Sequence, residues 1–278
     1  MTKARKTQIG LLITTVVLFV LLFLVPKKPS GTKESSNQSP VTVNQAGGNL
    51  EPFIDIATKS LKTSEKTSYD LLLQIAKKSI NDTAYLTVVQ FWDKQKKPDF
   101  AAYFMEKIAE KANTSSAYSK AGDRYYYAIR FVKDNNEIPI LYKKAIGCYQ
   151  KAIAIDKHQI DAKIQLAACL VESGDNPMNG IALLREVEQT DSNNVKLQLT
   201  FAFFSVKSQQ WNKAIKRFEH VLRIDPTYIE AYLHLADVYE QQGQTVKTIE
   251  MLEIYAKATE DAMAKQEVLK YIKQLKNK

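Results

Sequence analysis

Apolar residues recur at helical spacing through most of the chain, and long stretches of this pattern repeat. Ala214–Gly243 reads AIKRFEHVLRIDPTYIEAYLHLADVYEQQG, and it aligns without a gap to Ala145–Gly174, which reads AIGCYQKAIAIDKHQIDAKIQLAACLVESG. In both stretches the apolar positions return every three or four residues, which is typical of amphipathic helices. The 278 residues include only nine Gly and eight Pro, so helix breakers are few. The pattern predicts successive helix pairs.

The repeating unit is about 34 residues long, a period typical of helical solenoids. One earlier unit is longer, and we expect its extra residues to lengthen both of its helices by about a turn and a half. The most N-terminal unit is the least regular. The predicted units are 82–114, 115–159, 160–194, 195–228 and 229–262.

Small and large residues alternate at fixed places in each unit. In the unit 195–228, Ala202 and Ala214 occupy positions 8 and 20, and Phe218 occupies position 24. Small side chains at a helix crossing allow close approach, and large ones fill the space beside it. Lys163 and Gln198 depart from the pattern, because position 4 otherwise takes a large apolar residue.

These positions resemble those of the tetratricopeptide repeat family. The resemblance covers residues 115–262 and extends more weakly to 82–114. It implies an all-α fold, a right-handed α-solenoid of helix hairpins. Residues 51–81 are then expected to form an N-terminal capping helix and residues 263–278 a C-terminal one, because the ends of a solenoid need a polar outer face.

The N-terminal 50 residues have a different pattern. Ile9–Val25 is apolar and uncharged, and as a helix it would span about 26 Å, enough to cross a bilayer. No small-residue cleavage site follows, so we expect a single-pass transmembrane signal anchor rather than a cleaved signal peptide. Residues 1–8 then form a short basic tail, and residues 26–50 form a flexible linker.

Together with a Lys-, Asn- and Ile-rich composition typical of bacteria, this anchor predicts a bacterial inner-membrane protein with its repeats in the periplasm. The numbers of basic residues on the two sides of the apolar run are nearly equal, so the positive-inside rule does not fix the orientation. Repeats that face the cytoplasm therefore remain the alternative.

The net charge of +9 does not predict nucleic-acid binding. Residues 1–50 contribute 6 − 1 = +5, and the remaining residues contribute 33 − 29 = +4, so the repeats are only mildly basic. The two cysteines, Cys148 and Cys169, form no C-x-x-C motif, and we expect buried free thiols.

The sequence carries no motif for catalysis, for a cofactor or for a metal. P-loop, G-x-S-x-G and H-E-x-x-H patterns are all absent from it. The three histidines are scattered, with none at metal-ligand spacing. We therefore expect a protein that is not an enzyme and binds no cofactor.

The family resemblance also implies a binding groove. In tetratricopeptide repeats the concave groove is lined by positions 2, 5, 9 and 12 of each first helix. An aromatic residue, Phe203, falls at one of these positions. The protein-binding residues implied in this way are Tyr126, Ile164, Ala168, Val171, Leu199, Phe203, Val206, Leu233 and Asp237.

The function implied is a membrane-tethered adaptor or scaffold that holds a peptide or helix of a protein partner in this groove. The basic clamp with which some family members bind acidic C-termini is missing from the groove positions. Two alternatives remain: an accessory subunit of an envelope enzyme or of a secretion or biogenesis complex, and a structural scaffold that forms homo-oligomers.

Overall fold

A computed structural model of the chain describes residues 49–79, 81, 83–132 and 134–277. These residues belong to one compact unit, Ala46–Lys278. The described residues form helices and connections without a strand. The all-α prediction is confirmed for this part of the chain, and the right-handed sense of winding stays a prediction. The predicted tail, anchor and most of the linker lie outside the described residues.

No helix in the described ranges is both long enough and apolar enough to cross a membrane. The helix α7 (Glu137–Ile155) is 19 residues long but carries charged residues such as Lys143, Lys144 and Lys151. The finding contradicts the membrane localisation expected above. The span predicted for it, residues 9–25, lies outside the described residues.

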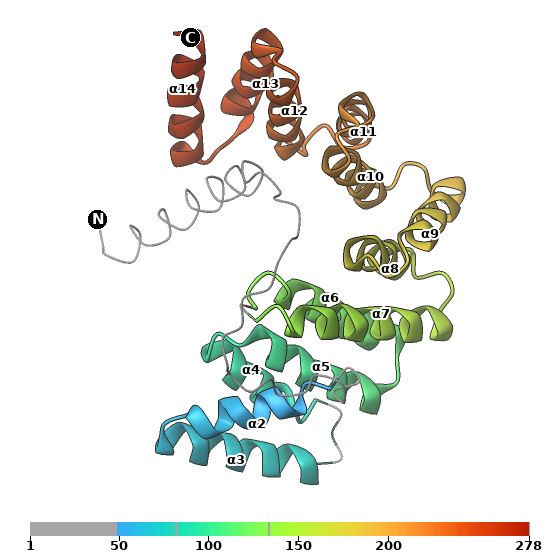
Figure 1. Ribbon diagram of the computed structural model, residues 1–278, viewed down its shortest axis with the longest axis vertical. Coiled ribbons are helices and arrows are strands. Elements are labelled where there is room, and N and C mark those ends of the chain that lie inside the picture. Colours follow the sequence, from blue (N-terminus) through green and yellow to red (C-terminus); the bar gives the residue numbers. More distant parts are fainter. Residues whose placement is uncertain (1–48, 80, 82, 133, 278) are drawn as a thin grey trace, which may run out of the picture. The chain divides into compact units, whose positions relative to one another are not determined.

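The helices follow one another with short connections (Figure 1). Before the repeats come α2 (Glu51–Ser60) and α3 (Thr63–Lys78). The others are α4 (Leu86–Lys94), α5 (Pro98–Ala112), α6 (Ser115–Ala128), α7, α8 (Ile160–Ser173), α9 (Pro177–Thr190), α10 (Val195–Lys207), α11 (Trp211–Ile224), α12 (Glu230–Gln241), α13 (Thr245–Ala258) and α14 (Ala262–Lys276).

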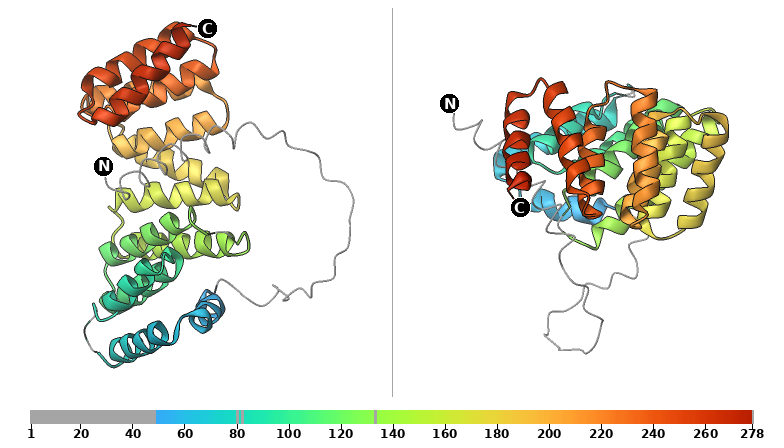
Figure 2. Two further views of the ribbon diagram at one scale, coloured as in Figure 1. Left: turned by 90° about the vertical axis from the view of Figure 1, so that its left-hand side faces the viewer. Right: turned by 90° about the horizontal axis from the view of Figure 1, so that it is seen from above.

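Neighbouring helices pack as pairs, and the pairs follow one another in chain order (Figure 2). The pairs are α4 with α5, α6 with α7, α8 with α9, α10 with α11, and α12 with α13, and α14 packs on α13. First helices of successive pairs also touch, because α8 contacts both α6 and α10. First helices therefore lie beside first helices, as in a helical solenoid.

Small residues hold the helices of a pair close together. A Cβ atom added to Gly122 on α6 would lie 2.7 Å from a ring carbon of Tyr149 on α7. A Cβ atom added to Gly180 on α9 would lie 2.6 Å from the Ala167 carbonyl oxygen on α8. Both distances are too short for real atoms, so these crossings depend on the absence of a side chain.

Two elements differ from the sequence-based expectation. Residues 51–81 hold two helices, because the backbone is extended at Lys62, and the Glu65 side chain accepts a hydrogen bond from the Lys62 N–H. In the long unit, α7 has 19 residues but α6 only 14. Asp134 caps the Asn136 N–H before α7, so the remaining extra residues form a connection instead of lengthening α6.

Polar residues at apolar positions of the repeat find partners. Gln198 is fully buried, and its amide group donates to the Ser192 carbonyl oxygen (2.7 Å) and accepts from Arg217 Nη1 (2.7 Å). Lys163 Nζ lies 2.8 Å from Glu186 Oε1 on the paired helix. Paired in this way, the two departures from the pattern do not disturb the packing.

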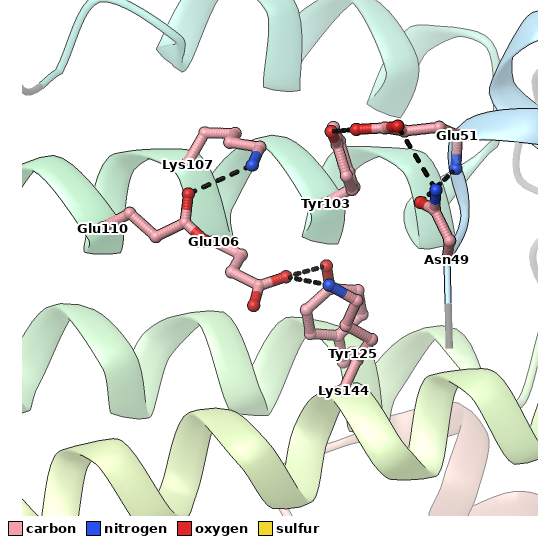
Figure 3. Close-up of polar contacts among 8 residues, drawn as sticks. All are labelled: Asn49, Glu51, Tyr103, Glu106, Lys107, Glu110, Tyr125 and Lys144. Atoms are coloured by element: carbon pink, nitrogen blue, oxygen red, sulfur yellow. Dashed lines mark hydrogen bonds and ion pairs between the residues drawn. The ribbon is translucent and has the colours of Figure 1, made fainter. Parts of the chain in front are cut away.

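A buried carboxylate links the three helices α5, α6 and α7. Glu106 Oε2 accepts a hydrogen bond from the Tyr125 hydroxyl (2.7 Å) and pairs with Lys144 Nζ (3.0 Å; Figure 3). On the same helix, Tyr103 donates to Glu51 of α2. These contacts connect the first helices of the described chain to its repeats.

Cys148 and Cys169 are buried and free, as expected. Burial raises the pKa of the Cys148 thiol to about 12 and also raises the pKa of Cys169. Both thiols are therefore protonated and unreactive at neutral pH.

Candidate functional site

An apolar strip runs along the exposed sides of α10 and α12. Residues spaced by three or four positions share one side of a helix, which places Leu199, Phe203 and Val206 together on α10. Leu233 and Asp237 lie four residues apart on α12. We call these five residues the α10–α12 face. Leu197, Gln198 and Ala202 of α10 are buried.

Phe203 is the most exposed apolar residue of this face, with 42% of its surface accessible. Its ring meets the rings of Phe218 on α11 and His234 on α12 edge to face, at centroid distances of 5.5 and 4.9 Å. The Phe218 and His234 rings stack on each other at 5.1 Å, and Phe218 is buried. The Phe218 and His234 rings hold the Phe203 ring in one place, while much of its surface stays open to solvent.

The other apolar residues of the face surround this ring cluster and are half-buried. Leu199 and Val206 pack against the core group that contains Phe218 and Leu235. Leu233 packs against the core formed by α12, α13 and α14. The α10–α12 face is therefore continuous with the packed interior beneath it.

Asp237 gives the face a carboxylate in an unusual environment. Its side chain is partly exposed, yet the helices around it and, to a smaller extent, the charge of the neighbouring Glu240 together raise its pKa to about 6. The carboxylate touches solvent on one side and is surrounded by protein on the others. Burial also lowers the pKa of His234, although Glu230 opposes this shift, so the imidazole is neutral at pH 7.

The structure places the predicted groove residues of α6 and α8 differently. Ile164 and Ala168 are 0% and 5% exposed, and Ile164 packs with Leu184 and Leu197 between α8, α9 and α10. These two residues belong to the core, because α10 lies directly against α8. A ligand on the surface does not reach them.

Tyr126 and Val171 are half-buried. The Tyr126 hydroxyl donates to Glu172 Oε2 (2.9 Å), and the Tyr142 hydroxyl donates to the same oxygen (3.2 Å). This network joins α6, α7 and α8. It stabilises the stack, and the structure does not bring it together with the α10–α12 face.

Sequence reasoning missed His234 and Phe218 as parts of the site. His234 occupies position 6 of its unit, next to groove position 5, and Phe218 occupies a core position on a second helix. The signal was the spacing: His234 lies one turn before Asp237, and both follow a conspicuous Phe203 one repeat earlier. Only the packing of α10, α11 and α12 shows that the three rings meet.

Two hollows of the described surface lie away from this face. One of about 480 Å³ lies between α3 and α4, and one of about 300 Å³ lies along α9. Within the described ranges, no group of three or more His, Cys, Asp or Glu residues could hold a metal ion.

A protein-family model described as "TPR repeat" matches residues 206–243. This stretch has tetratricopeptide-repeat sequence and holds the second helix of the unit 195–228 and the first helix of the unit 229–262. It begins at Val206, at the end of α10, continues through α11 and ends after α12 at Gly243, so it includes Phe218, Leu233 and Asp237. Tetratricopeptide repeats stack helix pairs into binding surfaces for other proteins. The unit bounds outside the matched stretch stay predictions from the sequence spacing.

Comparison with other proteins gives distant similarities. Superkiller protein 3 of Schizosaccharomyces pombe (strain 972 / ATCC 24843) is 25% identical over 158 residues, which is 54% of this chain and 10% of that protein. This chain therefore matches about a tenth of the length of that relative.

Solved structures with tetratricopeptide-like helix pairs are also similar. One is titled "Crystal structure of YrrB: a TPR protein with an unusual peptide-binding site"; it is 19% identical, with a TM-score of 0.42, covering 71% of this chain and 96% of that one. Another is titled "Functional Characterization of Pseudomonas Aeruginosa pilF"; it is 16% identical, with a TM-score of 0.48, covering 70% of this chain and 90% of that one.

Proposed function

We propose that this protein is a non-enzymatic scaffold and that its α10–α12 face binds a segment of a partner protein. One observation supports the proposal above all others: a phenylalanine ring is held by two other rings and still left 42% exposed. Large aromatic side chains, phenylalanine among them, are enriched in the buried cores of protein interfaces.

The packing around Phe203 favours binding energetically. Because Phe218 and His234 already fix the ring, little side-chain entropy remains to be lost when a partner covers it. Covering apolar surface contributes roughly 25 cal/mol per Å² before the costs of association. Leu199, Val206 and Leu233 extend the apolar area on both sides of the ring.

The proposal predicts that Phe203→Glu abolishes partner binding. The matched control is Val246→Glu, which places the same charge on α13 at a side chain that is 81% exposed. Affinity-tagged full-length chains are used to isolate partners, which are compared by quantitative mass spectrometry. Partners retained by Val246→Glu and lost by Phe203→Glu support the proposal. Identical partners for wild type and both variants contradict it.

A homo-oligomeric scaffold is a second candidate, favoured by α3. Leu71 and Ile75 lie one turn apart on this helix and are 56% and 55% exposed. Sedimentation velocity on the full chain tests the idea. An assembly that dissociates in a Leu71→Ser, Ile75→Ser double variant supports it, and a monomer at all concentrations excludes it.

A further inference from the structure

The groove positions of the first helices are acidic, although the whole chain carries a net charge of +9. Positions 2, 5, 9 and 12 of the four units between residues 115 and 262 include one basic residue, Lys196. Its Nζ already lies 3.7 Å from Asp161 Oδ1 on the neighbouring helix. The acidic residues at these positions are Asp123, Asp161, Glu230, Asp237 and Glu240.

The acidic residues of α12 lie on the helix whose His234 contacts the exposed ring, and they lack a basic partner. In the described part of the chain, no Lys or Arg forms an ion pair with Glu230, Asp237 or Glu240. Glu240 accepts a hydrogen bond from the Tyr271 hydroxyl of α14, which brings no charge. The negative charge at this end of the face is therefore left for a ligand to neutralise.

Apolar and acidic groups alternate here over a short distance. The Phe203 ring lies 4.9 Å from the His234 ring, and Asp237 follows His234 by one helical turn. A Lys or Arg side chain combines an apolar stem with a charged end. Its stem or guanidinium plane can lie on the Phe203 ring while its charged end reaches the Asp237 carboxylate.

We propose that the segment bound by the α10–α12 face is cationic, with Lys or Arg next to an aliphatic or aromatic residue. The inference rests on the proposed function and specifies the chemistry of the partner. An acidic segment is disfavoured because like charges would meet at Asp237 and Glu240. Residues 51–278 are mildly basic as a whole, so a cationic peptide is attracted chiefly where acidic groups lack a basic partner, as on α12.

The test uses the full-length chain and three fluorescent peptides of equal length. The first alternates Lys or Arg with Leu, the second has Glu in place of every basic residue, and the third has Gln there. Fluorescence anisotropy gives the affinities. We expect the cationic peptide to bind at least tenfold more tightly than the other two, and its affinity to fall as salt rises.

Two variants locate the binding. Asp237→Lys is expected to weaken binding of the cationic peptide by roughly tenfold or more, since it replaces an attraction by a repulsion. Glu250→Lys makes the same charge change at an exposed position of α13 and is expected to change affinity less than twofold. Asp237→Asn removes the negative charge without reversing it, so it is expected to weaken binding less than Asp237→Lys. Thermal melting checks that each variant folds.

The outcomes separate this inference from the proposed function. If the Glu-containing peptide binds more tightly than the cationic one and no longer binds the Phe203→Glu variant, the cationic chemistry of the partner is overturned. The α10–α12 face is then still a binding site. Equal loss of affinity in Asp237→Lys and Glu250→Lys overturns the inference, because the attraction is then non-specific. Absence of cationic-peptide binding also overturns it, while the partner comparison for Phe203→Glu still decides the proposed function.

Discussion

Two glycines of one helix pair show how strongly a single position depends on its neighbours. Gly122 on α6 faces the ring of Tyr149, whose hydroxyl is held by Asp123 Oδ1 at 2.8 Å. Gly147 on α7 has no neighbouring atom within 4 Å of an added Cβ. The same substitution therefore has opposite consequences at the two sites.

Gly122→Ala is expected to destabilise the protein by about 1–3 kcal/mol, because the new methyl group displaces the buried Tyr149 ring. Gly147→Ala is expected to stabilise it by about 0.5–1 kcal/mol, because alanine loses less backbone entropy in a helix. Urea denaturation of both variants measures the two changes. A stabilising Gly122→Ala would mean that α6 and α7 are not as close as described.

The helices α5, α6 and α7 are linked through one carboxylate, Glu106, which is 7% exposed. We expect Glu106→Ala to cost about 3 kcal/mol, because Lys144 and the Tyr125 hydroxyl lose their common partner in a buried site. The control is Glu110→Ala on the same helix, where the carboxylate forms an exposed ion pair with Lys107 and contributes under about 1 kcal/mol. Equal costs in denaturation experiments would contradict the linking role.

A second carboxylate site lies at the N-terminal ends of α5 and α7 and makes stability depend on pH. Asp99 and Glu137 are both buried. Burial and the charge of Asp99 raise the pKa of Glu137 to about 7, against the smaller opposing effect of Lys97. Burial also raises the pKa of Asp99. The folded state thus holds protons that the unfolded chain releases above the ordinary pKa of glutamate, about 4.5.

The stabilisation from protonated Glu137 is therefore complete below pH about 4.5 and is lost as pH rises through about 7. Glu137→Gln is expected to flatten this part of the pH–stability curve and to make the protein more stable than wild type at pH 8. Thermal melting between pH 5 and pH 8 measures the slope for both proteins. Parallel curves would show that Glu137 titrates normally.

Much of the helix pattern follows from sequence spacing because it depends on local chemistry. The period places α8 with α9, α10 with α11 and α12 with α13, since apolar residues on one side of each helix must be covered by its partner. Sequence spacing did not predict the break between α2 and α3 at Lys62. It also did not predict how the extra residues of the long unit are divided between α7 and the connection before it. They depend on a side-chain cap and on a connection that the period does not encode.

The accessibility of the residues of the proposed binding face was only partly predictable, for a different reason. Phe203, Leu199, Val206, Leu233 and Asp237 are accessible, as the family positions imply. Ile164 and Ala168 occupy the same family positions but are buried. Their burial depends on how closely α10 lies on α8, which is a property of tertiary packing and not of position within one repeat.

At the scale of the whole described unit, first and second helices have different roles. Second helices such as α11 supply the core beneath the face, as Phe218 does, and first helices such as α10 and α12 present the aromatic and acidic groups. The charged groups differ in the same way: the acidic residues at the groove positions lie on first helices, although the chain as a whole is basic. A partner is therefore expected to approach from the side of α10 and α12.

The most direct test of this division is site-specific photo-crosslinking in cells. The photoreactive residue p-benzoylphenylalanine replaces Phe203 on α10 in one full-length variant and Val246 on α13 in another. Both positions are exposed, so both can react with whatever lies beside them. The account predicts a discrete adduct with a protein partner at position 203 and none at position 246. The same adduct at position 246, with none at position 203, would contradict it.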